Sequence, residues 1–145
     1  MTHSSIARGL LALLCGLQGL WTLVIDLGHS HATNPEWIRH ARFHVVWQVI
    51  DAVLLSIVEL LLILSPGPFP DERFYLAAIL ASVPMLGFFG AWIGRRIYGG
   101  ALSDPNGIQP VRIVVFGSER HIDLSLVTEA VALGMLLAIV LLFRR

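Results

Sequence analysis

The sequence contains no lysine, a single cysteine and few charged residues. All ten basic residues are arginines, and ten acidic residues balance them to a net charge of zero, so no basic surface for nucleic acid is expected. Because Cys15 is the one cysteine, the chain has no internal disulfide. Charged residues make up 14% of the sequence, whereas soluble domains average about 25%. This shortage of charge indicates a membrane protein.

Hydrophobic residues make up 56% of the sequence, and many of them lie in long runs. Four runs, residues 6–27, 40–64, 74–98 and 122–143, each approach or exceed the roughly 20 residues needed to cross a bilayer. The first run is longer than the roughly 7–15 residues of a signal-peptide core, so we expect it to be retained. The sequence predicts an all-α fold, an integral membrane four-helix bundle, with residues 1–145 forming one multi-pass transmembrane domain.

Four crossings place both termini at the same end of the bundle, together with the proline-rich loop 65–73. The opposite end receives most of the histidines and many of the other polar side chains. Five of the six histidines are expected there: His29, His31, His40, His44 and His121. Chemistry is therefore expected at this second end, while the terminal end is expected to be structural.

The second run carries a row of polar residues along one helix face. At about 100° per residue, five polar side chains fall within an arc of roughly 100°. They are His40, His44, Gln48, Asp51 and Glu59. Since a charged residue at the bilayer centre costs about 2.5–3.5 kcal/mol, this row is expected to face the bundle interior or a wet cavity.

Asp51 lies about two helical turns below His44, well inside the hydrocarbon, where it must be either protonated or paired. Its expected counterpart is Glu129 in the last run, which shares a helix face with Ser125 and Thr128. Two carboxyl groups in different surroundings can divide the roles of general acid and general base. The same residues would equally suit a structural hydrogen-bond network. Glu59 lies nearer the membrane boundary at the terminal end, where its side chain could reach the headgroups, so a structural role is expected for it.

His40 and His44 stand four residues apart, the spacing at which two imidazoles on one helix can share a metal ion or face one cofactor. Interfacial histidines that bond loops or headgroups would show the same spacing. Both interpretations stay open at this point. In the third and fourth runs, Gly87, Gly90, Gly94 and Gly134 are expected to act as packing notches, because small residues allow membrane helices to approach closely.

The segment Asn34-Pro35-Glu36-Trp37-Ile38-Arg39-His40, followed directly by a spanning helix, resembles styrene oxide isomerase, a family of small four-helix membrane enzymes. The resemblance implies a trimer with a haem b ligated by His40, with His44 as a competing ligand. It also implies that ferric haem opens an epoxide to a carbonyl product, and it matches Tyr98 to a tyrosine of that family. The chain departs from the family pattern by having two histidines here and no carboxylate in its third run.

These observations together predict an enzyme that isomerises a hydrophobic small molecule or lipid taken from the membrane. His40 or His44 would hold haem b or a metal ion. Asp51 and Glu129 would be the catalytic acids, and Arg42 and Tyr98 would support them. Two alternatives stay open, a non-enzymatic module that handles haem, metal or protons, and a structural membrane subunit. Assembly into a homo-oligomer is compatible with each of the three.

Overall fold

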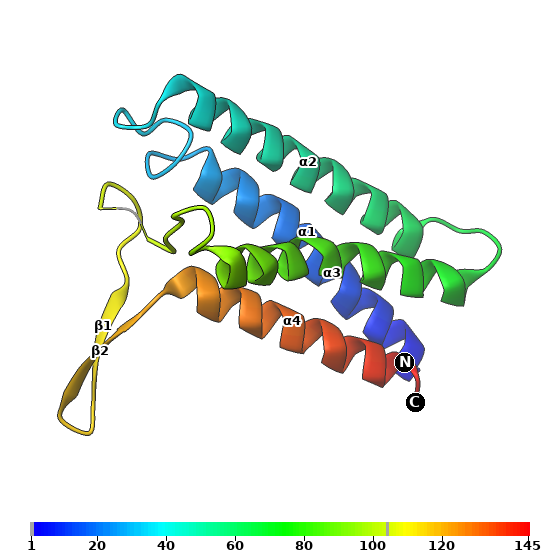
Figure 1. Ribbon diagram of the computed structural model, residues 1–145. Helices are drawn as coiled ribbons and strands as arrows, with labels where there is room; N and C mark the ends of the chain where they lie inside the picture. Colours follow the sequence, from blue (N-terminus) through cyan, green and yellow to red (C-terminus); the bar gives the residue numbers. More distant parts are fainter. Residues whose placement is uncertain (1, 104) are drawn as a thin grey trace.

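The computed structural model describes residues 2–103 and 105–145, and these residues form four long helices and one β-hairpin (Figure 1). In chain order the elements are α1 (His3–Asp26), α2 (Arg39–Leu64), α3 (Pro70–Gly94), β1 (Val111–Val115), β2 (Ser118–Ile122) and α4 (Leu124–Phe143). Each of the four helices is long and apolar enough to cross a membrane. The prediction of four candidate spanning helices is confirmed.

The helix ends follow local capping chemistry. The side chain of Thr2 accepts a hydrogen bond from the backbone N–H of Ser5, and that of Asp123 accepts one from Leu126 at 3.2 Å. Pro70 opens α3, where a missing N–H costs nothing. Helix α3 ends at Gly94, four residues before the predicted end at Tyr98, because the chain turns and reaches a left-handed Gly99 (φ 72°).

The hairpin corrects the all-α prediction, because it lies largely between the third and fourth hydrophobic runs, where no strand is predicted. Strands β1 and β2 pair antiparallel, with Val111 opposite Ile122 and Val115 opposite Ser118. Phe116 and Gly117 connect them with positive φ values of 49° and 75°, the backbone of a tight two-residue hairpin turn. Since β2 includes residue 122, α4 starts two residues later than expected.

The four helices form a ring in which α1 and α3 each pack against both α2 and α4. Both termini lie at one end of the bundle, and the α1–α2 connection lies at the other end with the segment between α3 and α4 (Figure 1). We call these the terminal end and the loop end. This arrangement confirms the predicted separation of the termini from the histidine-bearing segments.

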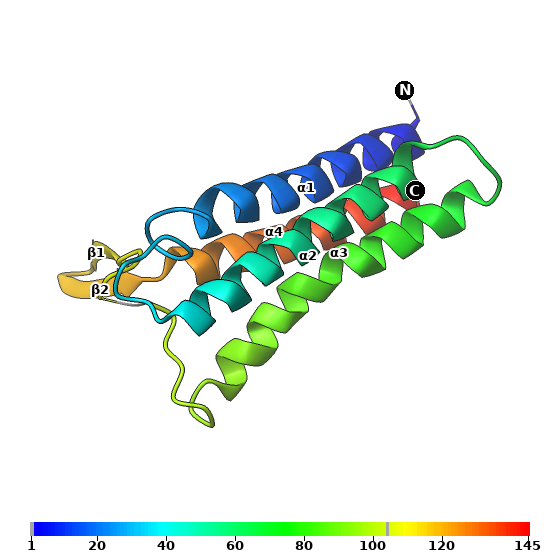
Figure 2. The ribbon, with the colours of Figure 1, turned by 90° about the horizontal axis from the view of Figure 1, so that it is seen from above.

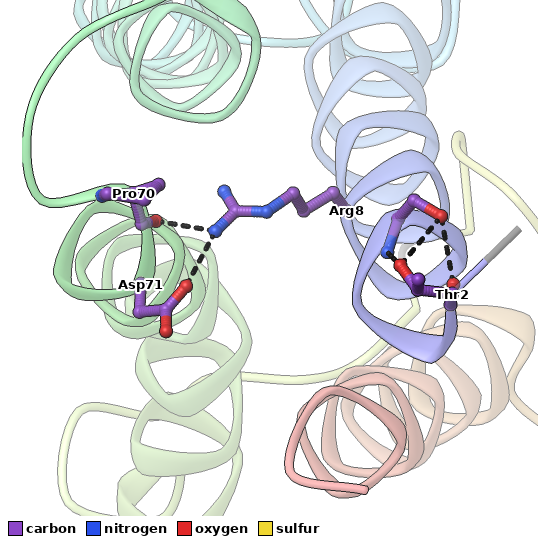
Figure 3. Close-up of polar contacts among 5 residues, drawn as sticks. Thr2, Arg8, Pro70 and Asp71 are labelled. Atoms are coloured by element: carbon purple, nitrogen blue, oxygen red, sulfur yellow. Dashed lines mark hydrogen bonds and ion pairs between the residues drawn. The ribbon is translucent and has the colours of Figure 1, made fainter.

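A compact core closes the terminal end. The rings of Phe74 and Phe143 stack with centroids 3.8 Å apart, and the guanidinium of Arg8 lies over both rings. The same Arg8 donates to the carbonyl of Pro70 at 2.8 Å and forms an ion pair with Asp71 at 3.1 Å (Figure 3). Arg8 thereby ties α1 to the start of α3, and the buried core residues of α1, α3 and α4 pack beside it.

The predicted packing notches are wrong. A Cβ placed on Gly87, Gly90, Gly94 or Gly134 would have no atom within 4 Å apart from its chain neighbours and the nearby backbone of its own helix. These glycines therefore face open space. The close helix contact is instead at Gly19 of α1, where an added Cβ would lie 2.7 Å from the Cβ of Ser56. Ser56 also donates to the carbonyl of Cys15 at 2.7 Å, which fixes α2 against α1.

Candidate functional site

A cavity of about 580 Å³ occupies the loop end of the bundle, where α3 diverges from α1 in the view of Figure 2. All four helices contribute to its wall. Three of the four tryptophans line it, Trp21, Trp37 and Trp92, together with Phe88. The wall is therefore rich in aromatic side chains, a surface suited to a small apolar molecule.

Glu129 brings a carboxyl group into this aromatic wall from the second turn of α4. The side chain is half-buried, and within residues 2–103 and 105–145 it has no hydrogen-bond or ion-pair partner. Ser125 and Thr128 line the cavity from the same helix, as the sequence pattern predicts, and Gln48 lines it from α2. The cavity thus holds one unpaired acid with hydroxyl and amide groups in the same wall.

A second acidic group, Asp26 at the end of α1, lies 3.8 Å from Nδ1 of His31. That nitrogen also lies 2.9 Å from the hydroxyl of Ser30, and the imidazole meets the Trp37 ring edge-on with centroids 5.4 Å apart. Both Asp26 and His31 line the cavity. Sequence reasoning missed Asp26, although an acid five residues before a loop histidine, at the end of a spanning helix, is a usable signal.

A smaller cavity of about 400 Å³ adjoins the first and lies between the α1–α2 connection and the segment after α3. The two cavities share seven lining residues: His31, Trp37, Ala101, Leu102, Ile108, Leu124 and Ser125. His31 and Trp37 therefore lie at the junction between the inter-helix cavity and the loops. Together the two cavities extend from the segment after α3 to the wall that carries Glu129.

Of the predicted supporting residues, Tyr98 lines the large cavity and Arg42 does not. The Tyr98 hydroxyl donates to the carbonyl of Ala91 at 2.9 Å, so its proton is engaged with the backbone. Arg42 donates to the carbonyls of Trp37 at 2.9 Å and Pro35 at 3.0 Å. Arg42 therefore acts on the cavity indirectly, by holding the loop that carries Trp37.

The predicted inward orientation of Asp51 is wrong, because this side chain is exposed on the outer face of α2 and does not approach Glu129. Ser56 and Glu59 show which face is buried, and Asp51 points well away from it. Glu59 does not reach toward the headgroups, since only 1% of it is exposed, and its Oε1 has no hydrogen-bond partner among the described residues.

His40 and His44 also lie on the outer face of α2, and neither lines the two cavities described above. Their Nε2 atoms are 3.1 Å apart and their rings meet edge-on. A haem needs an apolar slot beside its ligand, and within one chain these exposed rings lie against the outer surface of the bundle. The pair therefore does not fit a haem enclosed by a single chain.

Comparison with known proteins gives no match, whether with protein-family models, with curated proteins or with solved structures. The resemblance to styrene oxide isomerase accordingly stays a prediction from the sequence. The chemistry of the cavity has to be argued from its own residues.

Proposed function

We propose that the chain is a multi-pass membrane enzyme that isomerises a small hydrophobic molecule inside the loop-end cavity. The observation that carries this proposal is the unpaired carboxyl group of Glu129 in an aromatic wall. The cavity volume of about 580 Å³ lies within the roughly 300–1,000 Å³ of small-molecule sites. An apolar substrate carrying one polar oxygen matches a wall of this composition.

Glu129 serves as the general acid in this proposal. The protonated carboxyl group donates its proton to the substrate oxygen, and with an epoxide the adjacent C–O bond then opens. A hydride shifts between the two neighbouring carbons, and the carboxylate takes the proton back from oxygen as the carbonyl forms. Atoms and electrons balance without a co-reactant, and general acid–base catalysis of this kind contributes about 10²–10⁴-fold in rate.

The remaining polar residues position the substrate. Gln48 and Thr128 offer hydrogen bonds to the substrate oxygen from two different helices. His31, which is paired with Asp26, lies at the junction with the smaller cavity, where it can orient a polar group during entry. Haem b or a metal ion held by His40 and His44 would act outside this cavity, so no step of the isomerisation is assigned to either.

The experiment compares Glu129→Gln with the wild-type chain in lipid nanodiscs, with styrene oxide as the epoxide probe and chromatography of the carbonyl product. We expect kcat to fall at least 100-fold, because an amide cannot supply the proton. Glu119→Gln is the control, since this glutamate lies in the exposed hairpin with Arg112 at 3.4 Å, and it should leave kcat unchanged.

Full turnover in Glu129→Gln would overturn the assignment of the acid. Absence of turnover in the wild-type chain would overturn epoxide isomerisation. Saturable binding of the probe without turnover would instead support the alternative of a binding module.

A further inference from the structure

Helix α2 presents a continuous outer seam in which residues are spaced alternately four and three apart. The seam consists of His40, His44, Trp47, Asp51, Leu54, Val58 and Leu61. All seven side chains are exposed. Alternating spacings of three and four form the heptad pattern by which parallel helices pack along a shared seam. The opposite face of α2, with Val49 and Ser56, is already buried against the bundle.

Contact with lipid alone is unfavourable for this seam, because the seam contains a carboxyl group. Asp51 lies midway along α2, and it has no hydrogen-bond or ion-pair partner in the part of the chain that the structure describes. A charged group at that depth costs about 2.5–3.5 kcal/mol, and polar side chains between membrane helices provide the association that apolar ones do not. The outer seam would therefore be stabilised by a partner that places a polar group opposite Asp51, at the same depth in the membrane.

A second copy of the chain supplies that match. When two copies insert in the same direction, their α2 helices run parallel, and each seam position meets its own equivalent. Asp51 then lies opposite the partner's Asp51, where a protonated carboxyl group donates to the other carboxylate. The apolar positions Leu54, Val58 and Leu61 pack below this layer, and the histidines gather above it.

The histidine pair has the geometry of half a metal site. For a metal ion about 2.0–2.1 Å from each nitrogen, the 3.1 Å between the Nε2 atoms of His40 and His44 corresponds to a ligand angle of roughly 98°. No group of three or more metal-ligating side chains occurs among the described residues of one chain. The set is therefore incomplete until another chain contributes.

We propose that two copies of the chain pair through the outer seam of α2 and bind one divalent transition metal ion, such as Zn²⁺, with four imidazoles. His40 and His44 of each copy supply the four nitrogens, a neutral ligand set that suits zinc and its neighbours in the first transition row. This site is separate from the loop-end cavity and does not depend on the isomerase proposal.

Cysteine cross-linking tests the pairing of the seam in the full chain, reconstituted in lipid with Cys15 replaced by Ser. Leu54→Cys places a thiol in the seam, and Ile79→Cys is the control, an equally apolar and exposed position on α3. We expect a bismaleimide to convert most of the Leu54→Cys chains to dimers and few of the Ile79→Cys chains. Equal yields at the two positions would overturn the pairing.

Zinc binding tests the site itself, with protein stripped of metal by chelator and then titrated with Zn²⁺ alone. We expect one tightly bound Zn²⁺ per two chains, at least a 100-fold loss of affinity in His40→Ala and in His44→Ala, and no change in His121→Ala. One zinc per chain, no zinc, or equal binding in all three variants would overturn the site. Because both residues are exposed, neither alanine should impair folding.

Discussion

Arg42 shows how one side chain shapes the cavity without touching it. Its bonds to the carbonyls of Trp37 and Pro35 hold the loop that supplies an aromatic wall. Hydrogen bonds from a charged donor contribute about 1.5–3 kcal/mol each when desolvated, and less at this half-buried position. We expect Arg42→Ala to weaken binding of a hydrophobic probe about tenfold, measured as quenching of tryptophan fluorescence.

Arg39→Ala is the control for that measurement, because Arg39 is an exposed arginine three residues earlier. It should leave the affinity for the probe unchanged. An equal affinity in Arg42→Ala and the wild-type chain would show that Trp37 keeps its place without these bonds.

At the residue scale, the sequence predicts the polar character of helix faces better than their direction. The polar residues of α2 do share one side of the helix, as predicted. The bundle, however, buries Glu59 at one edge of that side and leaves His40, His44 and Asp51 exposed. A helical wheel fixes relative angles only, and the buried face depends on where α1 and α3 pack. Glu129 was predicted to face inward and lines the cavity, because the rest of its helix carries no competing polar face.

At the element scale, the contact between α1 and α2 depends on the absence of a side chain at Gly19. A methyl group there would lie 2.7 Å from the Cβ of Ser56, so the two helices must separate. We expect Gly19→Ala to lower the free energy of unfolding by about 1–3 kcal/mol, as overpacking does elsewhere. The same substitution at Gly87 meets open space and should raise it by about 0.4–1 kcal/mol.

Reversible unfolding in mixed detergent, followed by circular dichroism, measures both glycine variants. Because both variants replace a glycine with alanine, opposite changes in the free energy of unfolding would be caused by the different contacts at the two positions. Destabilisation of equal size in both variants would contradict the assignment of Gly19 as the contact point.

Helices were easier to predict than the hairpin for a physical reason. Four hydrophobic runs of membrane length leave few alternatives, and the observed helices agree with them to within four residues, with α3 starting and ending four residues earlier than expected. The hairpin turns at Phe116-Gly117 rather than at an Asn-Gly or Asp-Gly pair, so its strongest sequence signal is missing. The alternation in its second strand, Ser118–Ile122, is also weak.

At the scale of the whole molecule, the two ends of the bundle differ in packing. Arg8 and the stacked rings of Phe74 and Phe143 pack together at the terminal end, whereas both adjoining cavities lie at the loop end. This polarity follows from the sequence, which gathers polar and aromatic residues near the loop-end termini of the helices. A hydrophobic molecule that partitions into the membrane is therefore expected to bind at the loop end.

The most direct test of this account is a binding titration with styrene oxide, followed by quenching of tryptophan fluorescence. Ala91→Phe narrows the cavity, and Ala130→Phe is the matched control, because Ala130 is exposed and does not line the cavity. We predict saturable quenching in the wild-type chain and in Ala130→Phe, with the affinity at least tenfold weaker in Ala91→Phe. Quenching that fails to saturate, or equal affinity in all three chains, would contradict the assignment of the loop-end cavity as the binding site.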